Sequence, residues 1–242
     1  TGLRAKWNVL PDGKPGEYLT DRLTDEAVKF IRDNRERPFF LYFPHYGVHA
    51  PLEAKKEMIA KYEKIPEAER QGKPEYAAMV ESVDQSVGRV LETLKELGLE
   101  QNTLIIFTSD NGGFYNATSN APLRANKGAY YEGGIRVPLL IKWPGVTKAG
   151  EVIAEPVIST DFYPTCLAAA GLAQRPSQHL DGLNLQPLFG GKTSLGRKAL
   201  FWHFPHYTNQ GSRPTGAMRD ANWMLVEYYD TGQVELFDLK TD

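Results

Sequence analysis

Residues 103–113 read TLIIFTSDNGG, an apolar run that passes directly into polar and glycine residues. An unbroken apolar run of this kind is typical of a strand that helices cover on both faces. Residues 39–43 (FFLYF) and 137–143 (VPLLIKW) have the same texture, and residues 152–159 are a fourth candidate. We therefore expect a buried sheet built from short apolar strands.

Apolar residues recur with helical spacing between these strands. The helices we expect are one capped by Thr20 or Thr24 and ended before Pro38, then residues 53–63, 74–97 and 161–170. In the third of these, the spacing predicts a buried face of Tyr76, Val80, Val83, Val87, Val90, Leu91, Leu94 and Leu97. Gly98 and Gly171 suit C-terminal caps. Helices that alternate with strands predict a layered α/β fold.

The pattern changes near residue 199. Short strand-like runs follow at residues 199–203, 215–219, 223–228 and 233–237, and Asp230-Thr231-Gly232 suits a hairpin turn between the last two. These runs predict a small antiparallel subdomain. We therefore expect an α/β domain over residues 1–198 and an antiparallel C-terminal subdomain over residues 199–242.

Composition excludes several classes of protein. The 242 residues include 28 Lys and Arg against 30 Asp and Glu, so the net charge of −2 argues against nucleic-acid binding through bulk positive charge. The sequence holds no apolar run long enough to span a membrane. Cys166 is the single cysteine, which excludes an internal disulfide and a cysteine-based zinc site. Its helical context favours a core thiol.

The strongest candidate for a metal site is the pair Asp110-Asn111, which follows the strand quoted first. Ligands of α/β sheets bind beyond the carboxyl ends of strands, and carboxylate and amide oxygens suit a hard cation such as Ca²⁺ or Mg²⁺. Asp, Asn and Gly also dominate ordinary turns, so a simple turn is the alternative interpretation. The motif offers about three oxygens where such a cation takes six or more.

Two further residues suit the binding of an anion. Lys127, before a glycine in a long loop, is a compact positive charge, although most lysines are solvated surface residues. Glu132 and Arg136 are placed to pair and brace its loop. His49 is placed to give a proton or a hydrogen bond to an oxyanion, unless backbone carbonyls already satisfy it. His45 has the same opportunity.

The order of these motifs resembles the sulfatase family of the alkaline-phosphatase-like superfamily. The matching segments are residues 18–25, 38–43, 49–52, 78–84, 87–91, 108–112, 123–124, 127–138, 161–165 and 236–239. They cover nearly the whole chain, and residues 127–138 (KGAYYEGGIRVP) are highly specific. The resemblance implies an alkaline-phosphatase-like mixed sheet flanked by helices, with a small C-terminal antiparallel subdomain.

The resemblance also implies roles for single residues. Asp110 and Asn111 match the family's ligands for a divalent cation, usually Ca²⁺. Lys127 and His49 match residues that contact the sulfate group. Residues 201–207 resemble segments near the substrate pocket of carbohydrate sulfatases, which points to a sulfated sugar and to His206 as a substrate contact; an aromatic interface is the alternative.

The family's nucleophile is absent from the sequence. It is a formylglycine made from the Cys or Ser of a Cys/Ser-x-Pro/Ala-x-Arg motif, and family members carry it N-terminal to the segments matched here. Cys166 does not replace it, because Ala170 stands where the motif requires Arg. We therefore expect a piece of a longer sulfatase, inactive alone and with an incomplete calcium site.

Two other functions remain open at this point. One is a phosphodiesterase or phosphonate hydrolase of the same superfamily, and the other is a non-catalytic paralogue that keeps an anion pocket. The resemblance implies a periplasmic, secreted or lysosomal protein. For the chain alone we expect either oligomers, through uncovered sheet edges, or partial disorder near residues 111–135.

Overall fold

The computed structural model describes residues 13–210 and 212–241, and the chain divides into two compact units, Thr1–Gln101 and Asn102–Asp242. The antiparallel C-terminal strands lie inside the second unit, and the expected boundary between residues 198 and 199 stays a prediction. Each unit is described by itself.

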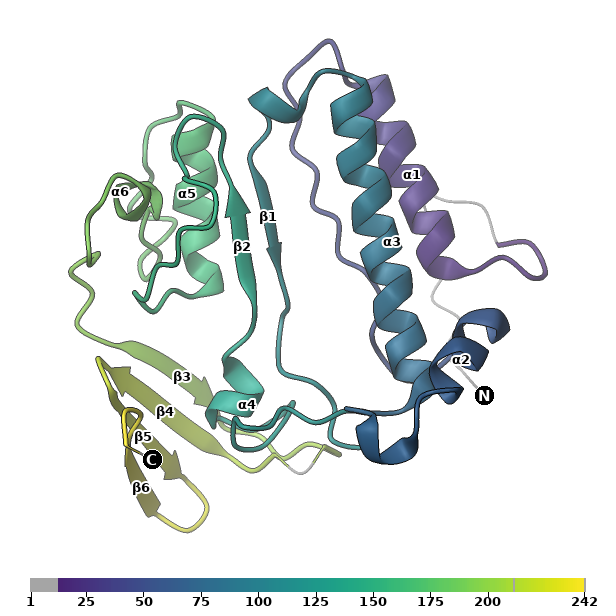
Figure 1. Ribbon diagram of the computed structural model, residues 1–242. Helices are drawn as coiled ribbons and strands as arrows, with labels where there is room; N and C mark the ends of the chain where they lie inside the picture. The colour runs from purple at the N-terminus through teal and green to yellow at the C-terminus, as the bar shows by residue number, and fades with distance from the viewer. Residues whose placement is uncertain (1–12, 211, 242) are drawn as a thin grey trace. The chain divides into compact units, whose positions relative to one another are not determined.

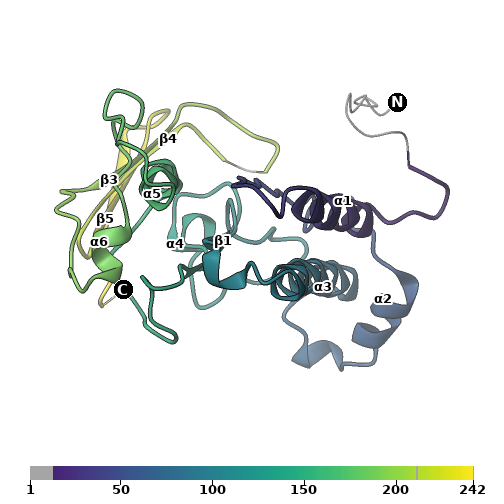
Figure 2. The same ribbon diagram turned by 90° about the horizontal axis from the view of Figure 1, so that it is seen from above.

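The first unit is helical. Helix α1 (Leu19–Asp33) lies alongside α3 (Pro74–Glu96), as Figures 1 and 2 show, and α2 (Lys56–Glu63) packs against α3. Short 3-10 turns follow at η1 (Glu67–Glu69) and η2 (Glu100–Asn102), the latter reaching into the second unit. The three helices confirm the expected segments to within a few residues.

The buried face of α3 differs from the predicted one. Small residues, including Ala78, Ser82 and Ser86, are buried, whereas Val80 is 46% exposed. Hydroxyl groups are satisfied inside this interface, where Ser86 Oγ lies 2.6 Å from Thr24 Oγ1. Leu94 is buried as predicted, at 3% exposed, but Leu91 is 41% exposed. Small side chains let α1 and α3 approach closely, so a pattern based on large apolar residues predicts only part of the buried face.

Two predicted strands are wrong. Residues 39–43 run outside any sheet, with Phe40 73% and Tyr42 77% exposed. Residues 152–159 also form no strand, and Val152 is 91% exposed. A strand exists only through hydrogen bonds to a neighbour, and within the described part of the chain neither segment has one.

The second unit begins with an antiparallel pair of strands, β1 (Ile105–Thr108) and β2 (Leu139–Lys142), in which Thr108 pairs with Leu139. Along the chain, β2 is followed by η3 (Ser159–Asp161), α5 (Phe162–Ala169) and α6 (Gln186–Phe189), and Figure 1 shows α5 and α6 to the left of β2. Their core consists of Leu185, Leu188 and Phe189 packed against Ile141, Trp143, Val146, Val157, Phe162 and Leu195.

A buried carboxylate ties this core together. Asp161 is 0% exposed and accepts hydrogen bonds from the backbone nitrogens of Ile158 at 2.9 Å and Leu183 at 2.8 Å. It also forms an ion pair with Arg197. All of its partners are donors, as a buried negative charge requires.

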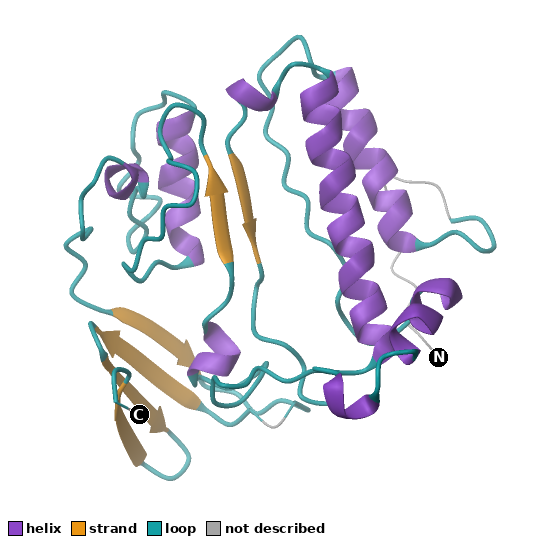
Figure 3. Cartoon of the chain, in the orientation of Figure 1, coloured by secondary structure: helices purple, strands orange, loops and turns teal. Residues whose placement is uncertain are grey.

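The C-terminal strands form the predicted sheet, shown in orange in Figure 3. It runs in the order β3 (Leu200–Phe204), β4 (Thr215–Asp220), β5 (Trp223–Tyr228) and β6 (Gln233–Asp238), all antiparallel. One face buries Ala217, Met224 and Val226 against Tyr130, Tyr131 and Ile135. The sheet is therefore a support for the segment that follows Lys127.

Both predicted glycine caps are confirmed. Gly98 has a φ of 69°, and the next nitrogen, of Leu99, donates to Leu94 O at 2.8 Å. Gly171 has a φ of 66° and closes α5 with the equivalent bond from Leu172 to Leu167 O at 2.9 Å. Glycine is suited to both positions because other residues are strained at positive φ.

Candidate functional site

The Asp110-Asn111 pair is held at the end of β1. Thr108 Oγ1 donates to Pro138 O at 2.9 Å, which fixes the strand end, and Ser109 Oγ donates to Asn111 O at 2.9 Å. Asp110 is exposed and Asn111 is half-buried. Within residues 13–210 and 212–241, neither side chain makes a hydrogen bond or an ion pair. Both head groups are therefore available to a ligand.

Glycines allow the chain after this pair to lie directly against α4 (Glu132–Ile135). Gly112 N donates to Gly134 O at 2.9 Å, and a Cβ on Gly112 would lie 1.8 Å from Gly133 O. A Cβ on Gly133 would lie 2.2 Å from Ala125 O. No side chain fits at these contacts, so the glycines of the matched motif have a steric role.

Lys127 is brought to the same place. Its backbone nitrogen donates to Gly113 O at 3.1 Å, and Gly113 is two residues beyond Asn111. The side chain is half-buried, and its ammonium group makes no hydrogen bond or ion pair with the described residues. The loop thus brings the backbone of Lys127 close to the chain that follows the Asp110-Asn111 pair. An unpaired cation, carboxylate and amide on neighbouring backbone segments suit a ligand that carries both an anion and a metal ion.

Sequence reasoning gives no role to Asn120, yet its side chain crosses this loop and bonds Gly113 at both N and O. An Asn among Gly, Ser and Pro residues predicts only a turn, so no signal in the sequence identifies it. Residues 111–135 all lie within the described part of the chain, and the oligomers or partial disorder expected for the isolated chain stay a prediction.

The other end of the loop is anchored on the C-terminal sheet through Tyr131. Its hydroxyl donates to Glu235 Oε2 at 2.5 Å and lies 2.6 Å from Tyr228 Oη. The Arg124 guanidinium lies 3.9 Å from the Tyr131 ring centroid. Burial first, and then the bonds to Glu235 and Tyr228, raise the pKa of Tyr131 above its ordinary value. The phenol therefore stays a neutral hydrogen-bond donor at physiological pH.

The predicted brace between Glu132 and Arg136 is confirmed. Arg136 Nη1 lies 3.2 Å from Glu132 Oε1, and Arg219 Nη1 of β4 lies 3.8 Å from the same oxygen. The two arginines tie α4 both to its own C-terminal end and to the sheet.

His49 belongs to the first unit, so its joint action with Lys127 stays a prediction. Its Nδ1 lies 2.8 Å from Ala50 O, which is the backbone contact considered as the alternative, and the ring is exposed. Because a carbonyl oxygen only accepts, Nδ1 carries the hydrogen. Nε2 is therefore a donor only in the imidazolium form.

His45 and Cys166 belong to the packing of their units. His45 Nε2 lies 2.9 Å from Ser86 Oγ in the helical unit, and burial lowers the pKa of the imidazole. Cys166 is half-buried in α5, and burial raises the pKa of its thiol. A thiol of this kind is a poor nucleophile, in agreement with the core role expected for it.

His206 lies on the connection between β3 and β4. It is exposed, and its ring meets that of Phe204 edge-on with centroids 5.3 Å apart. Further along the same connection, Ser212 Oγ donates to Gly128 O at 2.5 Å. The connection that carries His206 therefore touches the residue after Lys127, and a substrate role for His206 stays a prediction.

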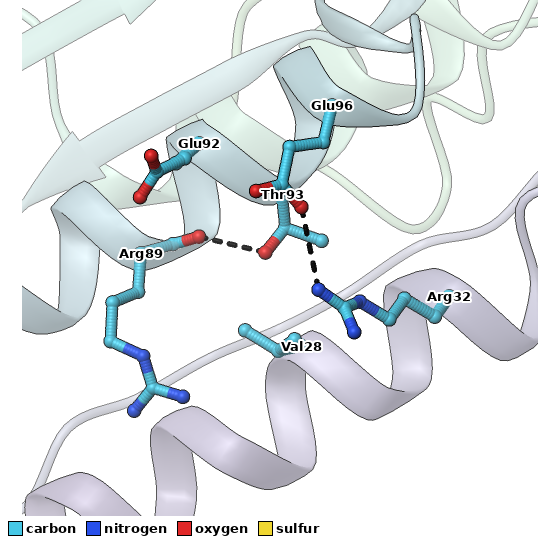
Figure 4. Close-up of a pocket in the computed structure, with 6 residues that line it drawn as sticks. All are labelled: Val28, Arg32, Arg89, Glu92, Thr93 and Glu96. Carbon is cyan, nitrogen blue, oxygen red and sulfur yellow. Dashed lines mark hydrogen bonds and ion pairs between the residues drawn. The ribbon is translucent and has the colours of Figure 1, made fainter.

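Figure 4 shows a different pocket, on the first unit between α1 and α3. Three of its four charged side chains have partners: Arg32 Nη2 lies 3.4 Å from Glu96 Oε2, and Arg89 Nη2 lies 2.6 Å from Asp25 Oδ1. Exposed pairs of this kind contribute little to stability, and both arginines of the pocket are already engaged in them. We do not assign a function to this pocket.

The donor set around Asp110 fits a hard cation in kind but not in number. Both side chains offer oxygen, as Ca²⁺ prefers. No group of three or more His, Cys, Asp or Glu side chains in the described part of the chain is arranged to hold a metal ion.

Among the described residues, no helix has the length and apolar character needed to cross a membrane.

Comparison with protein families gives two matches. Residues 3–172 match the model of the sulfatase family, and residues 125–242 match that of the N-sulphoglucosamine sulphohydrolase C-terminal region. A sulfatase from Formosa agariphila is 37% identical over 255 residues, which cover 96% of this chain and 46% of the relative. Human N-acetylgalactosamine-6-sulfatase is 38% identical over 181 residues, 72% of this chain and 33% of its own length.

Among solved structures, Ps i-CgsB in complex with k-i-k-neocarrahexaose matches with a TM-score of 0.82 and 36% identity. The match covers 93% of this chain and 49% of that one. It confirms the expected fold class. The chain spans less than half the length of each of these three proteins.

Proposed function

This chain belongs to the sulfatase family, and we propose that it forms the sulfate-holding part of an enzyme that hydrolyses sulfate esters. The observation that carries the proposal is the bond of 3.1 Å from Lys127 N to Gly113 O, which holds the backbone of Lys127 against a residue two positions beyond Asn111, while its ammonium group has no partner among the described residues. A fixed cation next to the ester sulfate stabilises charge that develops on its oxygens during S–O bond cleavage.

The proposal includes a divalent cation, expected to be Ca²⁺, held by the Asp110 carboxylate and the Asn111 amide oxygen. When bound, such a cation draws negative charge onto the sulfate oxygens. Because these two residues give about three of the six or more oxygens required, the other ligands come from outside this chain. So does the formylglycine nucleophile, since Cys166 lacks the motif. We call the longer sulfatase that contains this chain the parent enzyme.

His49 is proposed as a second contact to the sulfate group. Since Nδ1 faces Ala50 O at 2.8 Å, Nε2 donates to an anion only when the ring is protonated. The imidazolium form therefore adds both a hydrogen bond and a positive charge.

The proposed substrate is a sulfated carbohydrate. The exposed His206 and the aromatic residues next to it, Phe204 and Tyr207, give a surface on which a sugar ring can stack and form hydrogen bonds. Two similar proteins support this class: Ps i-CgsB, whose structure is a complex with k-i-k-neocarrahexaose, and human N-acetylgalactosamine-6-sulfatase. An exported or lysosomal location belongs to the same proposal and rests on family resemblance.

The test compares Lys127→Ala with Lys148→Ala in the parent enzyme. Lys148 is an exposed lysine of the same unit. We expect Lys127→Ala to lower kcat/KM for an aryl sulfate by about 100-fold or more, the usual loss for one charge-stabilising group, and Lys148→Ala to leave it unchanged. Faster turnover of a phosphate ester than of a sulfate ester would instead support a phosphodiesterase or phosphonate hydrolase.

The chain by itself gives a second test. We expect the 242-residue polypeptide not to hydrolyse an aryl sulfate and to bind Ca²⁺ weakly, because it lacks the nucleophile and most of the metal ligands. Measurable hydrolysis would contradict this. The remaining alternative is a non-catalytic paralogue, and the genomic reading frame tests it. An upstream in-frame Cys/Ser-x-Pro/Ala-x-Arg motif would exclude it.

A further inference from the structure

The side chain of Asn120 replaces a strand neighbour for the peptide that follows the Asp110-Asn111 pair. Its Oδ1 accepts from Gly113 N at 2.9 Å, and its Nδ2 donates to Gly113 O at 3.0 Å. A carboxamide is the only side-chain group that offers an acceptor and a donor in this paired geometry. The peptide at Gly113 is thereby fixed on both sides.

The same amide also reaches the residues just before Lys127. Asn120 Nδ2 lies 2.9 Å from Asn126 Oδ1 and 3.3 Å from Ala125 O. The two hydrogens on Nδ2 face three acceptor oxygens, those of Gly113, Ala125 and Asn126, so at least one hydrogen is shared between two acceptors. Lys127 N donates a separate hydrogen bond to Gly113 O at 3.1 Å, so both segments are joined at this peptide. One side chain therefore joins the segment after Asn111 to the segment before Lys127.

We propose that Asn120 is a positioning residue that sets the place of the Lys127 ammonium relative to Asp110 and Asn111, and through it the affinity for the sulfate group. This inference rests on the proposed sulfate-binding role of Lys127. Asn120 itself does not contact the sulfate; its amide is used up in bonds within the loop.

The decisive variant is Asn120→Asp, which keeps the shape of the side chain and the acceptor for Gly113 N. The second carboxylate oxygen of the variant faces Gly113 O, Ala125 O and Asn126 Oδ1. The hydrogen bonds that Nδ2 donates to these oxygens are therefore lost, and the carboxylate repels them. A displacement of about 1 Å at a reacting group costs about 100-fold in rate. We expect kcat/KM of the parent enzyme for an aryl sulfate to fall by about that factor, and stabilisation of the enzyme by inorganic sulfate, measured as a rise in Tm, to be lost.

Asn34→Asp is the matched control. Asn34 also uses both ends of its amide, with Nδ2 2.7 Å from Phe30 O and Oδ1 2.8 Å from Arg37 Nε, but it lies in the helical unit. Replacing the amide nitrogen of Asn34 by oxygen removes the bond to Phe30 O and leaves the Lys127 loop unchanged. Arg37 still donates to the new carboxylate, and only the bond to Phe30 O is lost. We expect unchanged kcat/KM and an unchanged response to sulfate, whatever the change in Tm.

A double-mutant cycle with Lys127→Ala separates positioning from general damage. If Asn120 acts through Lys127, Asn120→Asp changes kcat/KM by less than about threefold once Lys127 is alanine, because coupled residues are not additive. Should Asn120→Asp fail to fold, Asn126→Ala removes one acceptor of the same amide and is expected to lower kcat/KM by roughly threefold to tenfold, the value of one hydrogen bond, with the same loss of effect beside Lys127→Ala.

Three results would overturn the inference: effects of Asn120→Asp and Lys127→Ala that multiply, an Asn34→Asp variant that reproduces the loss, or wild-type sulfate response in Asn120→Asp. The proposed function fails separately, if Lys127→Ala alone leaves kcat/KM and the sulfate response unchanged. In that case the inference fails with it.

Discussion

The close contact of α4 with the Lys127 loop predicts that Gly133→Ala damages the site by steric displacement. The added Cβ lies 2.2 Å from Ala125 O and 2.4 Å from Arg124 O, whereas ordinary contact begins at 3.4 Å. The backbone must therefore move by about 1 Å. It also loses the bond from Gly133 N to Arg124 O, now 2.8 Å long.

Such overpacking costs about 1–3 kcal/mol of folding free energy, and a shift of this size near a reacting group costs about 100-fold in kcat/KM. Both are measured on the parent enzyme, by thermal unfolding followed by circular dichroism and by aryl sulfate hydrolysis. The matched change is Gly88→Ala in α3, where an added Cβ meets nothing within 4 Å. It is expected to stabilise the helix by about 0.5–1 kcal/mol and to leave activity unchanged. Wild-type stability and activity in Gly133→Ala would refute the reasoning.

Three further predictions concern groups away from the loop. Asp161→Ala breaks the buried pair with Arg197 and is expected to lower the free energy of unfolding by about 3–5 kcal/mol, measured by urea unfolding; a loss below 1 kcal/mol would contradict the burial. Because burial lowers the pKa of His45 below its ordinary 6.5, the unfolded chain binds more protons below pH 6.5, so stability is full above that pH and falls as the pH drops. His45→Gln is expected to flatten this slope in pH-dependent Tm measurements. Cys166, whose pKa burial raises, should react with a thiol reagent at pH 8 far more slowly in the folded than in the guanidinium-unfolded chain, and equal rates would count against this packing.

The sequence predicts local features well where one residue has one physical role. Gly98 and Gly171 mark helix ends because they take the positive φ that other residues avoid. The four C-terminal strands were expected within one residue of their ends because short strand-like runs and the Asp230-Thr231-Gly232 turn mark them. These signals are local, so they need no knowledge of the rest of the chain.

The sequence fails where the partner decides the outcome. Residues 39–43 have a strand composition, but no strand pairs with them in the described part of the chain. The buried face of α3 includes Ala78, Ser82 and Ser86 because α1 approaches closely there, and hydrophobicity alone predicts only Leu94 among the buried residues. The role of Asn120 could not be predicted from the sequence for the same reason, because it consists of hydrogen bonds to peptides up to seven residues away.

The anchor of Tyr131 on Glu235 and Tyr228 limits how such enzymes can be recombined. A chimera that keeps this loop but takes its last two strands from a relative without Tyr228 and Glu235 separates the phenol from its partners. The exchange then leaves a half-buried hydroxyl without its partners and the anion-binding loop without its support. Crossover points for grafting new specificity are therefore better placed so that residues 124–131 and strands β5 and β6 come from the same parent.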